Sequence, residues 1–180
     1  MSRYIAFLRA VNVGGRIVKM AALRSIFEEL GYQQVSTFIA SGNVIFETRS
    51  AAALTLERRI ESKLREALGF DVATMLRTDA EVAAVAAYEP FEGSDEVVAG
   101  RTHVGFLSTT LSDPARIAID GMETDFDSFH VNGREVYWRC SVKIGESKFS
   151  NVKFEKATGT KVTFRNVTTV RKLSALYPPG

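Results

Sequence analysis

The order of apolar patterns over the first 78 residues constrains the fold more than any other feature of this sequence. Continuous apolar or alternating runs predict strands, and apolar residues recurring every three or four positions predict helices. These patterns predict, in order, a strand at 3–11, a helix at 20–30, strands at 35–40 and 44–48, a helix at 52–68 and a strand at 72–77. The β-α-β-β-α-β order is typical of the split β-α-β, or ferredoxin-like, unit.

The second half of the chain repeats this order in outline. The run Arg101–Leu107 resembles Ser2–Leu8 in its last five positions, and Asn132-Gly133 between alternating runs is a strong hairpin signal. A helix is predicted over 148–157 and a terminal helix over 167–176, but no clear final strand lies between them. We therefore predict an α+β fold with two ferredoxin-like units in tandem, each an antiparallel sheet with helices packed on one face, and a C-terminal helix.

The predicted boundaries follow from these patterns. Residues 1–78 form the first unit. Residues 79–100 form a linking helix and loop, and Thr78 with Glu81 resembles a capping box at the start of that helix. Residues 101–180 form a second, degenerate unit that ends in the C-terminal helix.

Composition indicates in which cellular compartment the protein is expected. No apolar run approaches the roughly 20 residues that a membrane-spanning helix needs, so we predict no membrane partner. No signal peptide is indicated, and a lone cysteine, Cys140, is typical of a reducing compartment, so we predict a cytoplasmic location. Charge is uneven: residues 79–133 carry two Lys or Arg against eleven Asp or Glu, whereas residues 134–180 carry ten against three.

Two polar loops are predicted to meet at one edge of the first sheet. In a ferredoxin-like unit the end of the first strand and the turn between strands two and three lie at the same edge. Glycine amides, side-chain amides and cations there are the components of a phosphate-binding site, although Gly and Asn are also ordinary turn residues. The candidate ligand-binding residues at this edge are Arg9, Asn12, Gly14, Gly15, Lys19, Ser41, Gly42 and Asn43, with Arg16 as a further cation.

Three runs of this sequence resemble a known family. Tyr4–Gly15, Phe38–Phe46 and Phe154–Leu173 are similar to the characteristic segments of a mainly bacterial domain-of-unknown-function family, DUF1697. The resemblance implies an α+β fold of ferredoxin-like units and brings no established activity. It also adds a third segment of the chain to the candidate site.

That third segment is Arg165–Thr169, near the C-terminus. The family usually has Arg-Asn-Trp-Asn-Thr there. This chain keeps Arg165, Asn166 and Thr169 but has Val167 in place of the tryptophan and Thr168 in place of the second asparagine. Any role that depended on the aromatic ring or on that amide is therefore weakened.

Signatures of common catalytic and cofactor sites are missing from the sequence. His103, His130 and Cys140 are not clustered in the sequence, and no Gly-x-Ser-x-Gly, Walker or dinucleotide-binding pattern occurs. We therefore predict no metal and no cofactor. No acid–base pair can be assigned either, which leaves open whether the protein is an enzyme.

Three functions are compatible with these patterns. The first is binding of a small anionic or phosphorylated ligand, such as a nucleotide, at the polar loop cluster. The second is RNA binding through the basic segment from Lys143 to Lys172. The third is an enzyme that uses the same loop cluster for an unassigned reaction. We rank ligand binding first because polar and glycine residues are expected to converge at one sheet edge.

Overall fold

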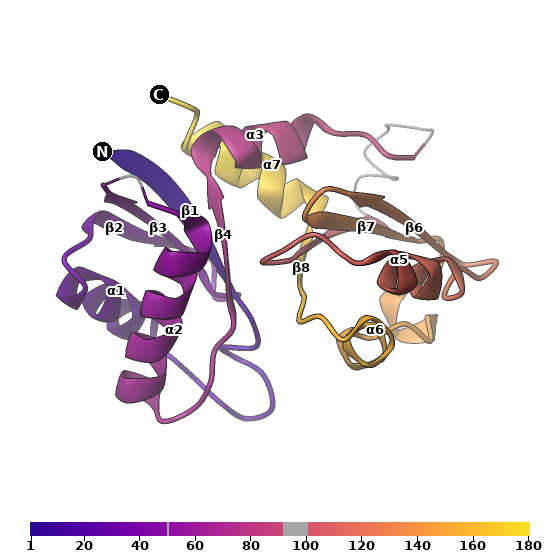
Figure 1. The fold of residues 1–180 in the computed structure, drawn as a ribbon, viewed down its shortest axis with the longest axis horizontal. Coiled ribbons are helices and arrows are strands. Elements are labelled where there is room, and N and C mark those ends of the chain that lie inside the picture. The colour runs from indigo at the N-terminus through magenta and orange to yellow at the C-terminus, as the bar shows by residue number, and fades with distance from the viewer. Residues whose placement is uncertain (50, 92–100) are drawn as a thin grey trace. The chain divides into compact units, whose positions relative to one another are not determined.

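The computed structural model describes residues 1–49, 51–91 and 101–180, so most of the predicted loop at 91–100 lies outside the described residues. The chain divides into two compact units (Figure 1). The first comprises Met1–Ala83 with Tyr177–Gly180, and the second comprises Ala84–Leu176. Among the described residues, no helix is long and apolar enough to cross a membrane.

The first unit is a four-stranded antiparallel sheet with the predicted element order. Its strands lie in the order β2-β3-β1-β4, so β3 separates the parallel strands β1 and β2. The elements are β1 (Ser2–Leu8), α1 (Met20–Glu29), β2 (Gln33–Phe38), β3 (Asn43–Thr48), α2 (Ala53–Leu68) and β4 (Thr74–Thr78), with α3 (Asp79–Ala87) following.

The core of this unit lies between one face of the sheet and helices α1 and α2. Alternate residues of β1 point to that face, and α1 contributes its three buried apolar residues, which recur at helical spacing. Aromatic rings form the centre of the layer, with the ring centroids of Tyr32 and Phe46 4.4 Å apart. The main buried contributors are Tyr4, Ala6, Leu8, Leu23, Ile26, Phe27, Phe46, Leu56, Ile60, Leu64 and Leu76.

The edge strand β4 is protected by three glutamates. The backbone amides of Thr74, Leu76 and Thr78 donate to carboxylates of Glu61, Glu57 and Glu81, respectively, each at 2.8 Å. These carboxylates satisfy amides that would otherwise be open to pairing with another strand. The third bond belongs to the predicted capping box, which is confirmed because the Glu81 amide donates back to Thr78 Oγ1 at 3.2 Å.

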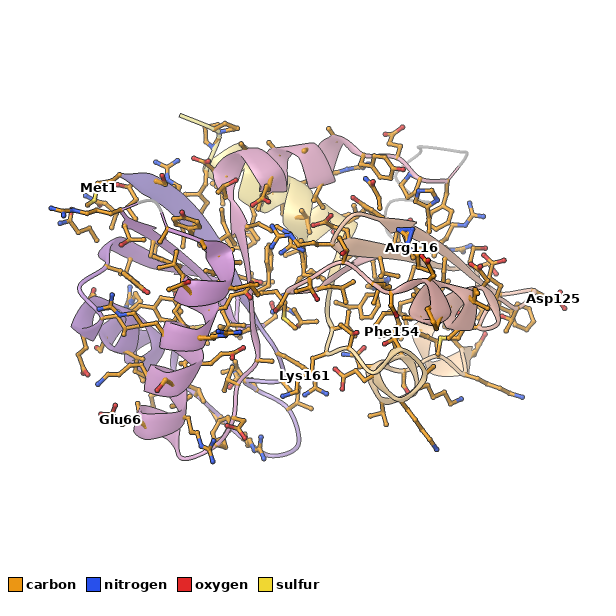
Figure 2. All side chains as sticks on the ribbon, viewed as in Figure 1. Met1, Glu66, Arg116, Asp125, Phe154 and Lys161 are labelled. Atoms are coloured by element: carbon orange, nitrogen blue, oxygen red, sulfur yellow. The ribbon has the colours of Figure 1, made fainter. Side chains whose placement is uncertain are left out.

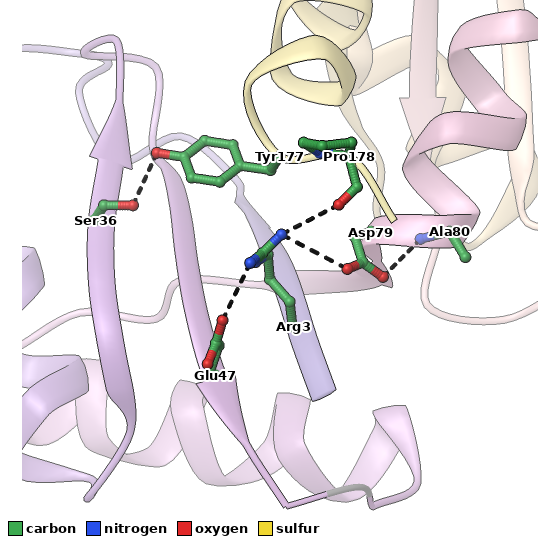
Figure 3. A network of polar contacts seen from close by, with 7 residues as sticks. All are labelled: Arg3, Ser36, Glu47, Asp79, Ala80, Tyr177 and Pro178. Carbon is green, nitrogen blue, oxygen red and sulfur yellow. Dashed lines mark hydrogen bonds and ion pairs between the residues drawn. The ribbon is translucent and has the colours of Figure 1, made fainter. Parts of the chain in front are cut away.

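The C-terminal residues 177–180 belong to the first unit and are fastened to its sheet (Figure 3). The Arg3 guanidinium donates to the Pro178 carbonyl at 3.2 Å and pairs with the Glu47 carboxylate at 3.3 Å. A hydrogen bond of 3.0 Å joins the hydroxyls of Ser36 and Tyr177. The chain therefore returns to its first sheet after completing the second unit.

The second unit has the same topology as the first. Its strands lie in the order β6-β7-β5-β8, the counterpart of β2-β3-β1-β4. Its elements are β5 (Thr102–Phe106), α5 (Asp113–Asp120), β6 (Asp127–Asn132), β7 (Glu135–Cys140), a short 3₁₀ turn η1 (Ile144–Glu146), α6 (Asn151–Thr158), β8 (Thr163–Asn166) and α7 (Val167–Leu176). Phe154, labelled in Figure 2, is fully buried in its core, together with Leu107, Ile119, Val136 and Val162.

The structure adds one strand to the predictions for this unit and shifts the start of one predicted helix. A final strand does exist: β8 pairs antiparallel with β5, so the unit is complete rather than degenerate. The strand has only four residues, and its pairing with β5 defines it more than its own pattern does. The helix predicted over 148–157 begins at Asn151, because the Ser150 hydroxyl accepts the Lys153 amide and caps the helix there.

Three features, two hydrogen bonds and one buried side chain, occur at equivalent places in both units. The Leu8 amide donates to the Gly42 carbonyl in the first, and the Leu107 amide donates to the Arg134 carbonyl in the second. Glu155 accepts the Val162 amide at 3.0 Å, as Glu61 accepts that of Thr74. The third pair is two buried arginines, Arg77 opposite Ile5 and Arg165 opposite Val104. The shared details support an internal repeat.

Candidate functional site

Three loops of the first unit meet at the edge of the sheet where β1 ends. The Leu8 amide donates to the Gly42 carbonyl at 2.8 Å, and the Arg9 amide donates to the Ala73 carbonyl at 2.9 Å. Asn12 Nδ2 donates to the Ala40 carbonyl at 2.8 Å. These bonds join residues 9–19, 39–42 and 69–73, which we call the edge loops.

Asn12 is a positioning residue within the edge loops. One end of its side chain donates to Ala40, and the other end, Oδ1, accepts the Val18 amide at 2.6 Å. Both ends of the amide are therefore used inside the protein. The effect is to close residues 13–17 into an exposed loop that is pinned at its base.

Asn43 and Gly42 also have structural roles. The Asn43 side chain is fully buried, and its Nδ2 donates to the Phe38 carbonyl at 2.9 Å and to Ser41 Oγ at 3.0 Å. Gly42 has φ of +79°, and a Cβ there would lie 3.1 Å from Leu8 Cβ. Thus the turn is held tightly against β1, while Ser41 itself is exposed.

Cations dominate the exposed part of the edge loops. Arg16 and Lys19 are exposed and Arg9 is half-buried, and residues 9–19 and 39–42 contain no carboxylate. The third loop has one, Asp71, which forms an ion pair with Arg65 at 3.4 Å. The resulting local potential favours an anion.

The main chain at the loop tip adds hydrogen-bond donors. Gly14 and Gly15 both have positive φ, are exposed and have open space around their Cα atoms. Lys19 precedes α1 without a side-chain cap, and no acidic residue lies in the first turn of that helix. Uncapped amides at a helix start attract negative charge.

Arg16 is held in place by an aromatic ring. Its guanidinium carbon lies 4.4 Å from the centroid of the Phe70 ring, and Phe70 packs against the core of the first unit. A guanidinium fixed on an aromatic face can still present its edge to an anion or its other face to a planar ring. No pattern in the sequence marks Phe70 as part of a site; its only local signal is its place directly after Gly69, where α2 ends.

The backbone of the edge loops is strained at two residues. Ala10 has φ of +55° and Ile39 has φ of +51°, and both conformations are unfavourable for residues with a Cβ, most of all for β-branched isoleucine. Such strain is maintained only where surrounding contacts fix it, and it concentrates at functional sites. In the edge loops the fixing contacts include those of Asn12 and Asn43.

The C-terminal candidates belong to the second unit and have local roles there. Arg165 is buried and donates from Nη1 to Thr163 Oγ1 at 2.8 Å and to the Phe164 carbonyl at 2.9 Å. Burial lowers the pKa of its guanidinium to about 10, which keeps it charged at neutral pH. Asn166 Oδ1 accepts the Thr168 amide at the start of α7, and Thr169 lies half-buried in the same turn. Val167, between them in the sequence, is buried.

The described residues contain no cluster of three or more His, Cys, Asp or Glu side chains that could hold a metal ion. What the edge loops offer instead is a combination of accessible cations, amide donors and one stacked guanidinium. This combination suits recognition of an anion and contains no obvious acid–base pair.

Comparison with known proteins shows first a shared fold and then a sequence family. The fold is shared with the conserved bacterial protein SP0830 from Streptococcus pneumoniae: the two are 23% identical, the match covers 99% of each chain, and the TM-score is 0.74. No curated protein matches the sequence. The sequence pattern of the protein family of unknown function DUF1697 matches residues 1–137, and the chain belongs to that family.

Proposed function

We propose that the protein binds a small phosphorylated molecule at the edge loops of its first unit. The observation that carries this proposal is that the loop 9–19 contains Arg9, Arg16 and Lys19 together with the exposed Gly14-Gly15 tip and has no carboxylate. A phosphate group would meet cations and main-chain donors together, which is the usual chemistry of phosphate recognition.

The stacked arginine favours a nucleotide among such ligands. One face of the Arg16 guanidinium lies over Phe70, and the side chain is exposed. Nucleobases stack on arginine planes as well as on aromatic rings. In this proposal Lys19 and the glycine amides contact the phosphate, whereas Arg16 supports the base.

The asparagines act indirectly in this proposal. Asn12 and Asn43 hold the loops in place and have their amide nitrogens engaged, so they shape the site and leave recognition to the cations and amides. Arg165, Asn166 and Thr169 are not needed for it.

A thermal-shift experiment tests the proposal with adenosine monophosphate, inorganic phosphate and adenosine as probes. We expect adenosine monophosphate to raise the melting temperature most, because binding only to the folded state stabilises it. Lys19→Ala and Arg16→Ala should each remove most of that rise. Arg58→Ala, which removes an exposed arginine from α2, is the matched control and should leave it unchanged.

Two results would contradict the proposal. One is a rise in melting temperature that survives both edge-loop substitutions. The other is the absence of any stabilisation by phosphate-bearing probes at millimolar concentration in a buffer free of competing anions.

RNA binding is the second candidate, and the exposure of the basic segment favours it. Six lysines between residues 143 and 172 are exposed: Lys143, Lys148, Lys153, Lys156, Lys161 and Lys172. An anisotropy titration with single-stranded and duplex RNA at low salt tests this candidate. Affinity should fall steeply as salt rises, and a flat titration would exclude it. Either function fits a cytoplasmic protein with a single buried thiol.

A further inference from the structure

The second unit contains a cavity with a different chemistry from the edge loops. Its volume is about 250 Å³, and its lining residues are Arg101, His103, Cys140, Val142, Lys143 and Ile144. A cavity of this size holds about eight water-sized groups, since liquid water occupies about 30 Å³ per molecule. It is therefore suited to a small organic molecule.

The imidazole of His103 lies in the wall of this cavity and packs against an aromatic ring. It lies opposite Trp138 across the β5–β7 pair, with ring centroids 5.0 Å apart. Trp138 is itself fixed, because its indole nitrogen donates to the buried Asp127 carboxylate at 2.8 Å. The fixed indole therefore restricts the orientation of the imidazole.

One ring nitrogen of His103, Nδ1, is unpaired by geometric criteria within the described part of the chain. Nδ1 is buried and has no hydrogen-bond partner of acceptable geometry. Burial also lowers the pKa of the ring, an effect that the Arg101 main chain partly opposes, so the imidazole is neutral at pH 7. A neutral ring with its Nδ1 edge enclosed leaves Nε2 as the edge that a bound molecule can reach.

The charge of the cavity comes from its rim. Arg101 and Lys143 are exposed, and none of the described residues that line the cavity is a carboxylate. Arg101 is positioned by a hydrogen bond from Nη1 to the Ser141 carbonyl at 3.0 Å. Val142 and Ile144 add apolar surface beside these cations. Two cations, a neutral imidazole and an apolar wall match an organic anion with a short carbon skeleton.

We propose that this cavity is a binding site for a small carboxylate or phosphate ester. Arg101 and Lys143 pair with the anionic group, His103 Nε2 exchanges a hydrogen bond with a polar group of the ligand, and Val142 and Ile144 contact its carbon skeleton. The site belongs to the second unit and does not depend on the function proposed for the edge loops.

Histidine NMR provides a specific test, because His103 and His130 are the only histidines in the chain. His130 accepts or donates a hydrogen bond with the Tyr88 hydroxyl at 2.7 Å and serves as the internal reference. Succinate and glycerol phosphate are the probes, titrated at constant ionic strength with chloride as the balancing salt. We expect saturable movement of the His103 ring nitrogens and little movement of those of His130.

Variants separate a built site from general attraction to positive charge. Lys143→Ala should weaken binding of the better probe at least fivefold and, because Lys143 is exposed, should leave the fold intact. Lys156→Ala removes an exposed lysine from α6 and should change the affinity less than twofold. The proposal is overturned if His103 does not respond to either probe, or if the two lysine variants weaken binding equally.

Discussion

The two units share the same strand and helix topology but differ in the loop that follows the first strand, at the same edge of the sheet. After β1 the first unit has the long cationic loop 9–19, pinned by Asn12 and tipped by two glycines. After β5 the second unit has only the loop 107–112, in which Ser112 directly caps α5. Its cavity lies instead at the other end of β5, beside Arg101 and His103. Repeated topology therefore preserves the packing, while the loops determine the local chemistry.

The largest expected effect concerns the buried polar centre of the second unit. Asp127 is 3% exposed and accepts hydrogen bonds from Trp138, Ser147 and Thr124, whereas Gln33, which begins the equivalent strand β2 of the first unit, is exposed. Asp127→Ala should lower the free energy of unfolding by about 3 kcal/mol or more, because three donors lose a charged acceptor. Urea denaturation measures the loss.

Asp125→Ala is the matched control for this prediction. Asp125 is exposed and lies two residues away, so its loss should change stability by less than about 0.5 kcal/mol. Equal effects of the two substitutions would show that the Asp127 network does not stabilise the unit.

The two hairpin turns give the next largest contrast. Gly42 and Gly133 both have positive φ, but a Cβ at Gly42 would lie 3.1 Å from Leu8 Cβ, whereas the nearest atom at Gly133 is Glu135 Oε2 at 3.7 Å. Gly133→Ala should cost about 1 kcal/mol for the backbone alone, and Gly42→Ala should cost about 2–3 kcal/mol, since steric overlap is added. Thermal and urea unfolding of both variants measure the difference, and a larger cost at Gly133 would contradict this account of the turns.

Arg16→Ala separates stability from function in the edge loops. The exposed stack of Arg16 on Phe70 should contribute only about 0.5 kcal/mol to folding. Phosphate-ligand affinity should nevertheless fall at least fivefold, as measured by calorimetric titration. A variant that unfolds more easily by several kcal/mol, or one that binds normally, would contradict the assigned role.

The smallest expected effect is a pH dependence from the second unit. The pKa of His103 lies below its ordinary value of 6.5 because the ring is buried, with Arg101 and Lys143 as the charged neighbours lining the same cavity. Below pH 6.5 the unfolded chain takes up a proton that the folded chain does not. The free energy of unfolding therefore decreases as the pH is lowered, until the pKa of His103 in the folded state is reached. His103→Gln should flatten this part of the stability–pH curve, and an unchanged slope would exclude the residue as its source.

Local signals in the sequence predicted much of the fold. The capping box of Thr78 and Glu81 is a contact between residues three apart, so the pattern alone predicts it. The strand at Thr163–Asn166 was missed because four residues carry too little periodicity, and only pairing with β5 defines them. The burial of Arg165 also depends on tertiary packing, which no local pattern reports.

The candidate site was predictable only in its location. Topology alone predicts that the loops at Asn12 and Ser41–Asn43 meet, and hydrogen bonds do join them. Which side chains remain available could not be predicted, because that depends on atomic geometry. The asparagine amides point to backbone carbonyls, and Arg16 rests on Phe70 from a distant segment.

Amide NMR of the wild-type protein, titrated with the phosphate probe that stabilises it most, tests the central claim most directly. The account predicts that the largest shifts occur at the amides of Gly14, Gly15 and Arg16, with residues after Lys19 at the start of α1 next. Saturable binding that leaves these amides unmoved and shifts only residues of the second unit would contradict it.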